Sequence, residues 1–323
     1  MSPRKINSMD ARKLRYLAEY GVFCCLVFCL RCLPVATAGR VADSVAWFVR
    51  LLPRRLTRFQ VAADNIRTAF GEDTPDAEVD RIVLGMWQHL FRMVCEIIQL
   101  QRRFRLDRCG SYLDFYQRNE CVQAALSGRP VLFLGGHFGN WEISVNTFGH
   151  FGFPMGVVAR DLDNPYLHRW FLKFRESSGN WMISKSGAGN ELVEVMEAGG
   201  MAALLCDQDA GRRGVFADFF GRPASTFKSI GLLALQYDAL IVVGGAYRLP
   251  ADQQRNTNWV RFNLATQQII DSREFRDVES LTQQFTSALE DLIRKAPEQY
   301  FWVHRRWKTA LPEKRAAKRR QAA

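Results

Sequence analysis

From about residue 130 onward, short apolar runs alternate with longer stretches of helical periodicity. Alternation of this kind is typical of a mostly parallel central sheet flanked by helices. We therefore expect an α/β fold in this part of the chain. The strands are expected at 131–134, 155–159, 181–184, 201–206, 240–247 and 259–265, and the helices at 164–177, 190–198, 226–237 and 278–295.

The part of the chain before residue 130 has a different pattern, which is mainly helical. Residues 41–52 are apolar with basic interruptions, and residues 76–100 form a long periodic stretch. Between them, residues 65–70 run into Gly71, a residue type that commonly ends a helix. The expected organisation is a single domain over 41–308, helical over 41–125 and α/β over 126–308.

A run of ten apolar residues, Gly21–Leu30, lies near the N-terminus. Glu19 precedes the run and Arg31 follows it, whereas a helix needs about 20 apolar residues to cross a bilayer perpendicularly. We expect a retained helix within residues 1–40 that enters the membrane or lies on it, with arginines at the lipid headgroups. A secretory signal peptide and an amphipathic helix packed on the domain are the alternatives.

The net charge of +11 is concentrated at the two ends of the chain. Residues 1–19 hold five basic and two acidic residues, and residues 301–323 hold eight basic and one acidic. Basic ends favour an anionic membrane face or an acidic partner, and the sequence has no nucleic-acid recognition motif. We expect a flexible basic tail over 309–323. The mixture of aromatic and basic residues at 302–307 suits a membrane interface or an acidic carrier protein.

The eight cysteines do not have the spacing of a disulfide framework or a zinc site. Three of them lie in the apolar N-terminal run and Cys32 follows it closely, and they fit small apolar positions of one segment. A reducing compartment agrees with this usage. We expect no metal site, because a metal needs three or more convergent ligands and the surroundings of His137 offer one.

The most informative segment is 131–142, where an apolar strand leads through Gly135 and Gly136 into His137, with Glu142 five positions later. On a regular helix two residues five apart point about 140° away from each other. We therefore expect His137 in the turn before a helix and Glu142 in its first turn, so that the carboxylate orients the imidazole. A neutral imidazole held this way can act as general base toward an alcohol.

Several blocks of the chain together resemble a known family. His137-Phe-Gly-Asn-Trp-Glu142 is similar to the H-x4-D/E motif of glycerolipid acyltransferases, and more specifically to that of the late acyltransferases of lipid A biosynthesis, the lauroyl/myristoyl transferase group. Four further segments resemble blocks of that family in the same order: 65–70, 160–165, 207–221 and 297–308. The resemblance covers about residues 14–308.

The resemblance implies transfer of a fatty acyl chain from a thioester, usually on acyl carrier protein, to a hydroxyl of a lipid A precursor, without a cofactor. It also implies an N-terminal membrane anchor and a site at the cytoplasmic face of the inner membrane. Coenzyme A as acyl carrier is the alternative for the donor. His137 would act as general base oriented by Glu142. The residues expected to bind substrate are Arg160, Asn164, Asp207, Asp209, Arg212 and Arg213.

The arginines among these residues suit the phosphates of a lipid A precursor, because a guanidinium binds phosphate through two hydrogen bonds. Asp207 and Asp209 would orient the arginines or bind a sugar hydroxyl. Three alternatives stay open: an acyltransferase for another membrane glycolipid such as a phosphatidylinositol mannoside, a hydrolase or thioesterase in which water replaces the alcohol, and a non-catalytic membrane-binding module.

Overall fold

The computed structural model describes residues 8–254 and 259–312, and most of the expected basic tail falls outside these residues. Within them, a seven-stranded sheet has the order β1-β9-β8-β2-β5-β3-β4, and only the β8–β9 pair is antiparallel. The expected mostly parallel sheet with flanking helices is confirmed. The strands of this sheet are β1 (Leu113–Tyr116), β2 (Val131–Gly135), β3 (Gly156–Ala159), β4 (Trp181–Ser184), β5 (Met201–Leu205), β8 (Leu240–Arg248) and β9 (Phe262–Asp271).

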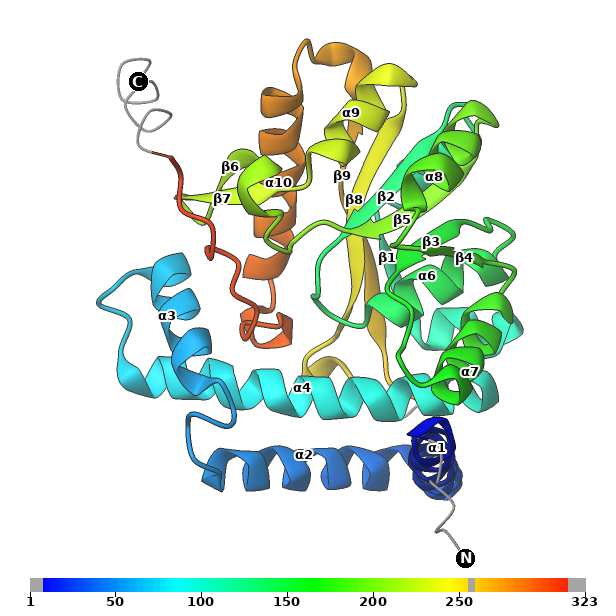
Figure 1. Ribbon diagram of the computed structural model, residues 1–323, viewed down its shortest axis with the longest axis vertical. Coiled ribbons are helices and arrows are strands. Elements are labelled where there is room, and N and C mark those ends of the chain that lie inside the picture. The colour runs from blue at the N-terminus through cyan, green and yellow to red at the C-terminus, as the bar shows by residue number, and fades with distance from the viewer. Residues whose placement is uncertain (1–7, 255–258, 313–323) are drawn as a thin grey trace, which may run out of the picture.

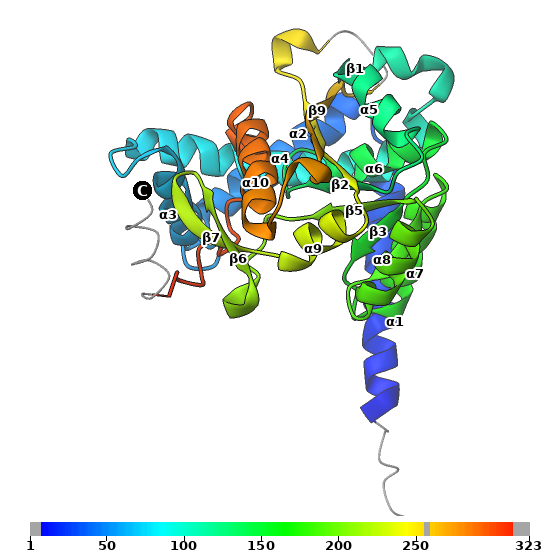
Figure 2. The same cartoon turned by 90° about the horizontal axis from the view of Figure 1, so that it is seen from above.

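Helices cover both faces of the sheet because alternate side chains of each strand point to opposite sides. Leu132 and Leu134 of β2 belong to the core shared with α8, α9 and α10, whereas Val131 and Phe133 pack toward α5 and α6. Figure 2 shows these two groups of helices on either side of the strands. The helices are α1 (Ser8–Cys32), α2 (Val35–Leu51), α3 (Phe59–Phe70), α4 (Asp76–Arg103), α5 (Arg118–Ala125), α6 (Trp141–His150), α7 (Pro165–Glu176), α8 (Ala188–Glu197), α9 (Lys228–Gln236) and α10 (Val278–Arg294).

Two strand predictions need correction. The stretch expected to be helical up to residue 125 contains β1, which pairs with β9 at the edge of the sheet. A separate hairpin of β6 (Val215–Phe219) and β7 (Arg222–Thr226) was not predicted. Its two-residue turn places Phe220 at φ 52° and Gly221 at φ 71°. A turn of this kind normally carries Asn or Asp before the glycine, so Phe-Gly gave no hairpin signal.

The long helix α4 lies across the edge of the sheet where β2 and β8 end, and α2 packs against the far side of α4 (Figure 1). Ala38, Ala42 and Ala46 recur every four residues along α2 and are all buried. Their small side chains let the two helices approach closely along one face. α2 and α4 therefore form two successive layers beyond the carboxyl end of β2.

The apolar N-terminal run forms part of α1, as expected. The C-terminal half of this helix packs through Val27 and Leu30 into a cluster with α2 and α4. Its first turns project away from the rest of the described chain (Figure 2), whereas from Tyr16 onward the helix contacts α7 and its N-cap. Among the helices that the structure describes, none is both long and apolar enough to cross a membrane.

Candidate active site

His137 and Asp207 come together at the carboxyl ends of two neighbouring strands. β2 and β5 are parallel, and Gly135 is in register with Leu205. Each of the two polar residues stands two positions beyond this registered pair, so both leave the sheet at the same edge. The backbone N–H of His137 donates to Asp207 Oδ2 at 2.7 Å, and His137 Nδ1 lies 2.8 Å from Asp207 Oδ1.

The hydrogen bond to Asp207 determines which ring nitrogen of His137 is basic. A carboxylate accepts, so the proton of the neutral ring is on Nδ1 and the lone pair is on Nε2. The side chain of Asp207 has no exposed surface, and that of His137 is 17% exposed. The arrangement therefore fixes Nε2 as the basic nitrogen of the ring, as a general base requires.

Burial and charge act in opposite directions on this pair. Burial alone would lower the pKa of His137, but the charge of Asp207 and its hydrogen bond outweigh burial and raise that pKa. For Asp207, burial would raise the pKa, but the charge and hydrogen bonds of His137 lower it to about 2. Asp207 is consequently ionised at neutral pH and stabilises the protonated form of the imidazole.

The expected hydrogen bond between Glu142 and His137 is not formed. Glu142 is the second residue of α6, and its carboxylate pairs with Arg175 of α7, with Arg175 Nε 2.9 Å from Glu142 Oε2. Asn140 caps the helix through Ile143 N, which makes α6 begin directly after the turn. Glu142 thus faces α7, and the carboxylate that orients His137 is that of Asp207.

The segment 300–304 packs against the other sides of the imidazole. The N–H of Phe301 donates to His137 O at 2.9 Å, and the His304 ring lies 4.7 Å from the His137 ring, centroid to centroid. The Trp141 ring approaches edge-on at 5.2 Å. Burial and the charge of His137 lower the pKa of His304, so this second imidazole is neutral at neutral pH.

The interfacial role expected for residues 302–307 does not fit the structure at Trp302 and Arg306, which are 1% and 2% exposed. Arg306 donates to Ser225 O at 2.5 Å and to Thr226 Oγ1 at 2.7 Å, so it joins the C-terminal segment to β7. Burial lowers its pKa, while the nearby Tyr300 and Asp207 oppose that effect. This part of the segment builds the wall of the site instead of presenting a surface.

An apolar cavity of about 100 Å³ lies between α6 and the sheet, beside the turn that carries His137. The ion pair of Glu142 and Arg175 lines it, together with Gly135 and Trp141. Apolar side chains make up most of the remaining wall, among them Phe133, Phe148, Met155, Val157, Leu205 and Val242. The cavity offers an apolar ligand a place beside the turn that carries His137.

The other residues expected to bind substrate, all of them within the described ranges, form no hydrogen bond or ion pair with His137 or Asp207. Asn164 caps α7 and donates to Tyr16 O of α1 at 3.0 Å, and the Asp209 carboxylate accepts from Thr309. Both side chains are thus used to connect segments of the protein. Arg160 pairs with Asp163 on the surface, and Arg212 and Arg213 are exposed in the short helix η2 (Gly211–Arg213).

Sequence reasoning missed Lys185, whose charge lowers the pKa of His137. Lys185 follows β4 directly, and its ammonium lies 5.2 Å from the Phe227 ring centroid. The signal was its position, because it stands after an expected strand at the same edge of the sheet as His137. No cluster of three or more metal-ligating side chains is present in the described part of the chain.

The chain is similar in sequence to several known proteins. A model of the family described as bacterial lipid A biosynthesis acyltransferase matches residues 6–309. The chain is 25% identical over 203 residues to the lipid A biosynthesis palmitoleoyltransferase of Escherichia coli (strain K12), which covers 62% of this chain and 63% of that protein. It is 27% identical over 183 residues to the lipid A biosynthesis lauroyltransferase of the same strain, covering 56% of this chain and 57% of that protein.

A second kind of relative has a different acceptor in its name. The chain is 28% identical over 142 residues to the phosphatidylinositol mannoside acyltransferase of Mycolicibacterium smegmatis (strain ATCC 700084 / mc(2)155), covering 42% of this chain and 45% of that protein. The matched parts span less than two thirds of the length of each of these three relatives.

Proposed function

The chain belongs to the bacterial lipid A biosynthesis acyltransferase family, and we propose that it transfers a fatty acyl chain from an acyl thioester to a hydroxyl group of a membrane glycolipid. One observation carries the proposal: the buried Asp207 holds His137 with its lone pair on Nε2, and the residues on either side of His137, Gly136 and Phe138, line an apolar cavity. An acyl transfer to an alcohol needs these two elements, a base for the hydroxyl proton and a place for the fatty chain.

Because the ring proton of His137 is on Nδ1, Nε2 is free to accept a proton in the reaction. Nε2 of His137 takes the proton of the acceptor hydroxyl as its oxygen attacks the thioester carbonyl carbon. A tetrahedral intermediate forms and collapses, the carbon–sulfur bond breaks, and the thiolate leaves with the electron pair. The imidazolium then returns the proton to that sulfur. Asp207 stabilises the imidazolium between the two proton transfers.

The cavity beside α6 is our candidate for the acyl chain. Its wall is mainly apolar, and burying methylene groups there is favourable by about 0.8 kcal/mol each. Glu142 and Arg175 neutralise each other where they line it, so the ion pair adds no net charge to the apolar site. We assign Glu142 a structural role in this wall.

For the acceptor we propose a lipid A precursor, with a phosphatidylinositol mannoside as the alternative that the mycobacterial relative supports. For the donor we propose acyl carrier protein, with coenzyme A as the alternative. Phosphate groups of the acceptor would meet Lys185 near His137 and the exposed Arg160, Arg212 and Arg213. Lysine and arginine are the side chains that most often bind phosphate.

We further propose that the protein docks on the cytoplasmic face of the inner membrane through α1 and α2. The face of α2 opposite the buried alanines exposes Val41, Val45, Trp47, Phe48 and Leu51. Arg40 and Arg50 of the same helix are also exposed. An exposed apolar face with tryptophan and arginines is typical of a helix that lies in the interface of an anionic bilayer.

The proposal is tested by incubating purified protein with radiolabelled acyl–acyl carrier protein or acyl-CoA and a panel of acceptors. The panel contains a lipid A precursor with a free hydroxyl, a phosphatidylinositol mannoside and phosphatidylglycerol. We expect labelled glycolipid, and none from His137→Ala. Release of free fatty acid alone would instead indicate a hydrolase, and transfer by His137→Ala at the unaltered rate would reject the role of this residue.

A further inference from the structure

The turn that follows His137 is held in an unusual backbone conformation. Gly139 has φ +59°, and a Cβ at this position would overlap the carbonyl of Ala246. The N–H of Asn140 donates to that same carbonyl at 2.6 Å, and Asn140 has no exposed surface. The turn therefore lies directly against β8 and depends on its surroundings for every polar group it buries.

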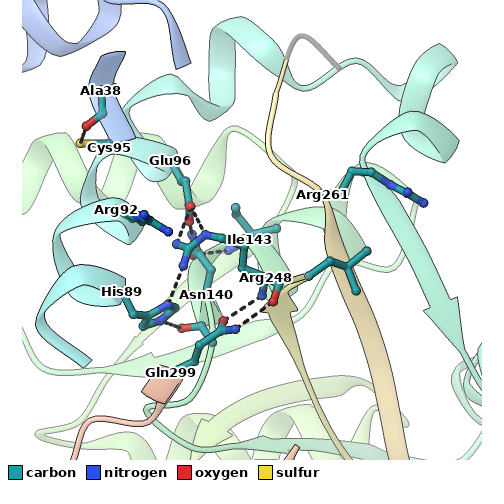
Figure 3. Close-up of polar contacts among 12 residues, drawn as sticks. Ala38, His89, Arg92, Cys95, Glu96, Asn140, Ile143, Arg248, Arg261 and Gln299 are labelled. Atoms are coloured by element: carbon teal, nitrogen blue, oxygen red, sulfur yellow. Dashed lines mark hydrogen bonds and ion pairs between the residues drawn. The ribbon is translucent and has the colours of Figure 1, made fainter. Parts of the chain in front are cut away.

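Two residues of α4 satisfy the polar groups of this turn (Figure 3). His89 Nε2 lies 3.0 Å from Gly139 O, and Asn140 Nδ2 donates to Glu96 Oε2 at 2.9 Å. The amide oxygen of Asn140 remains for the cap of α6. α4 thus contacts the turn at two successive residues, two and three positions after His137.

Arg248 at the end of β8 orients both of these α4 side chains (Figure 3). Its Nε donates to Glu96 Oε1 at 2.8 Å, and its Nη1 lies 3.1 Å from His89 Nδ1. Since a guanidinium can only donate, His89 Nδ1 accepts and Nε2 carries the proton given to Gly139. Burial and the charge of Arg248 lower the pKa of His89 to about 3, so the ring stays neutral.

Gln299 closes the group from the other side. Its side-chain amide pairs with both backbone groups of Arg248, at 2.8 Å each, and its backbone carbonyl accepts from Gly139 N at 2.9 Å. Together these side chains form a turn-holding network, which consists of His89, Glu96, Asn140, Arg248 and Gln299.

Stability alone does not explain why the network contains a buried ion pair. The side chains of Arg248 and Glu96 are 11% and 5% exposed, and a buried ion pair of this kind is often no more stabilising than apolar residues of the same volume. Apart from the contact between Arg248 and His89, the other hydrogen bonds described above involve the turn at 139–140 or Gln299, which binds the same turn. We infer that the turn-holding network consists of positioning residues that fix the direction of the His137 imidazole for acyl transfer. The inference rests on the proposed function.

An exchange of two side chains tests this inference. Asn140→Asp keeps an oxygen for the helix cap but places a carboxylate against Glu96. Glu96→Gln removes the acceptor charge that faces Asn140 and Arg248. In the double variant the new amide at position 96 can accept from Arg248 and donate to the new carboxylate at position 140. Both the hydrogen bonds and the net charge of the network therefore return.

We expect each single variant to lower kcat for acyl transfer about 10- to 100-fold while KM for the acyl donor stays within about threefold. The double variant should recover kcat to within about fivefold of the unaltered protein. Circular dichroism at the assay temperature establishes that each variant is folded. Asp271→Asn is the matched control. It breaks an ion pair with Arg129 where β2 begins and β9 ends, at the edge of the sheet opposite His137, and it should leave kcat unchanged.

The inference is overturned if the folded single variants keep kcat within about threefold, or if the double variant is no faster than the slower single one. Should the variants at 96 or 140 not fold, His89→Gln and His89→Leu replace them. The glutamine variant retains a donor toward Gly139 and should be at least about fivefold faster than the leucine variant, whereas equal rates contradict the inference. His137→Ala is measured in the same assay. If it stays active the proposed function fails, and if it alone is inactive only the network inference fails.

Discussion

At the scale of single residues, the central feature is that His137 and Asp207 stabilise each other's charged forms. The acid is fully buried and the imidazole is nearly so, and each shifts the pKa of the other in the direction that favours its charged form. This mutual stabilisation is a property of the folded state, so it must appear in the pH dependence of stability.

The pair should stabilise the fold most between about pH 4 and pH 6.5. The pKa of Asp207 is lowered from 3.8 to about 2, so its contribution, on the order of 2 kcal/mol, is present above pH 3.8 and is lost as the pH falls through about 2. The pKa of His137 is raised, so its contribution is full below pH 6.5 and is lost as the pH rises through the folded value. The difference in unfolding free energy between unaltered protein and Asp207→Asn, measured by denaturant titration across pH, should therefore be largest in that window. A difference that does not vary with pH would contradict the ion pair.

The Glu142–Arg175 pair should behave as one structural unit. Its side chains are 9% and 20% exposed, so removing either partner leaves the other charge largely buried. We expect Glu142→Gln and Arg175→Met each to lower the free energy of unfolding by about 2–4 kcal/mol. A double-mutant cycle should give a coupling energy of about 1–3 kcal/mol. Additive effects of the two changes would show that the pair is not coupled.

Residue partners were harder to predict than residue positions. Sequence pattern placed His137 and Asp207 directly after two expected strands, and the parallel register of β2 and β5 brings them together. The spacing of Glu142 suggested that it was the partner of His137. The presence of Arg175 on α7 opposite Glu142 depends on tertiary packing, and no local pattern in the chain encodes it.

At the scale of elements, strong periodicity predicted the helices and strands that form the centre of the fold. Edge elements were missed, because β1 is four residues long and the hairpin of β6 and β7 turns through an atypical Phe-Gly pair. The antiparallel β8–β9 pairing also followed from no sequence signal, although both strands were expected. The direction of a strand is decided by its connections and not by its composition.

The exposed face of α2 leads to a prediction about lipid binding. Trp47→Ser combined with Phe48→Ser removes two side chains that are 57% and 59% exposed. Because these side chains would enter the interface of the bilayer, cosedimentation with vesicles containing phosphatidylglycerol should weaken about tenfold or more. Leu232→Ser is the control, since Leu232 is 46% exposed on α9 and should not alter binding. Equal binding by the α2 double variant and the control would place the docking surface elsewhere.

At the scale of the whole molecule, the candidate site is assembled from segments that are distant along the chain. Its wall combines α4, the turn after β2, the turn after β5 and residues 300–306. The sequence indicated the two strand-end turns, because polar residues after buried strands are a local pattern. It did not indicate that α4 and the C-terminal segment close around them, since those contacts join residues far apart along the chain, such as His89 with Gly139 and Phe301 with His137.

The most direct test of the account is kcat for acyl transfer by Asp207→Asn, measured at pH 7 and at a temperature where the variant is folded. Asparagine at 207 can no longer stabilise the imidazolium or require the proton on Nδ1, so we predict a loss of about 10²- to 10⁴-fold. A kcat within about threefold of that of the unaltered protein would contradict the claim that Asp207 holds His137 as the base.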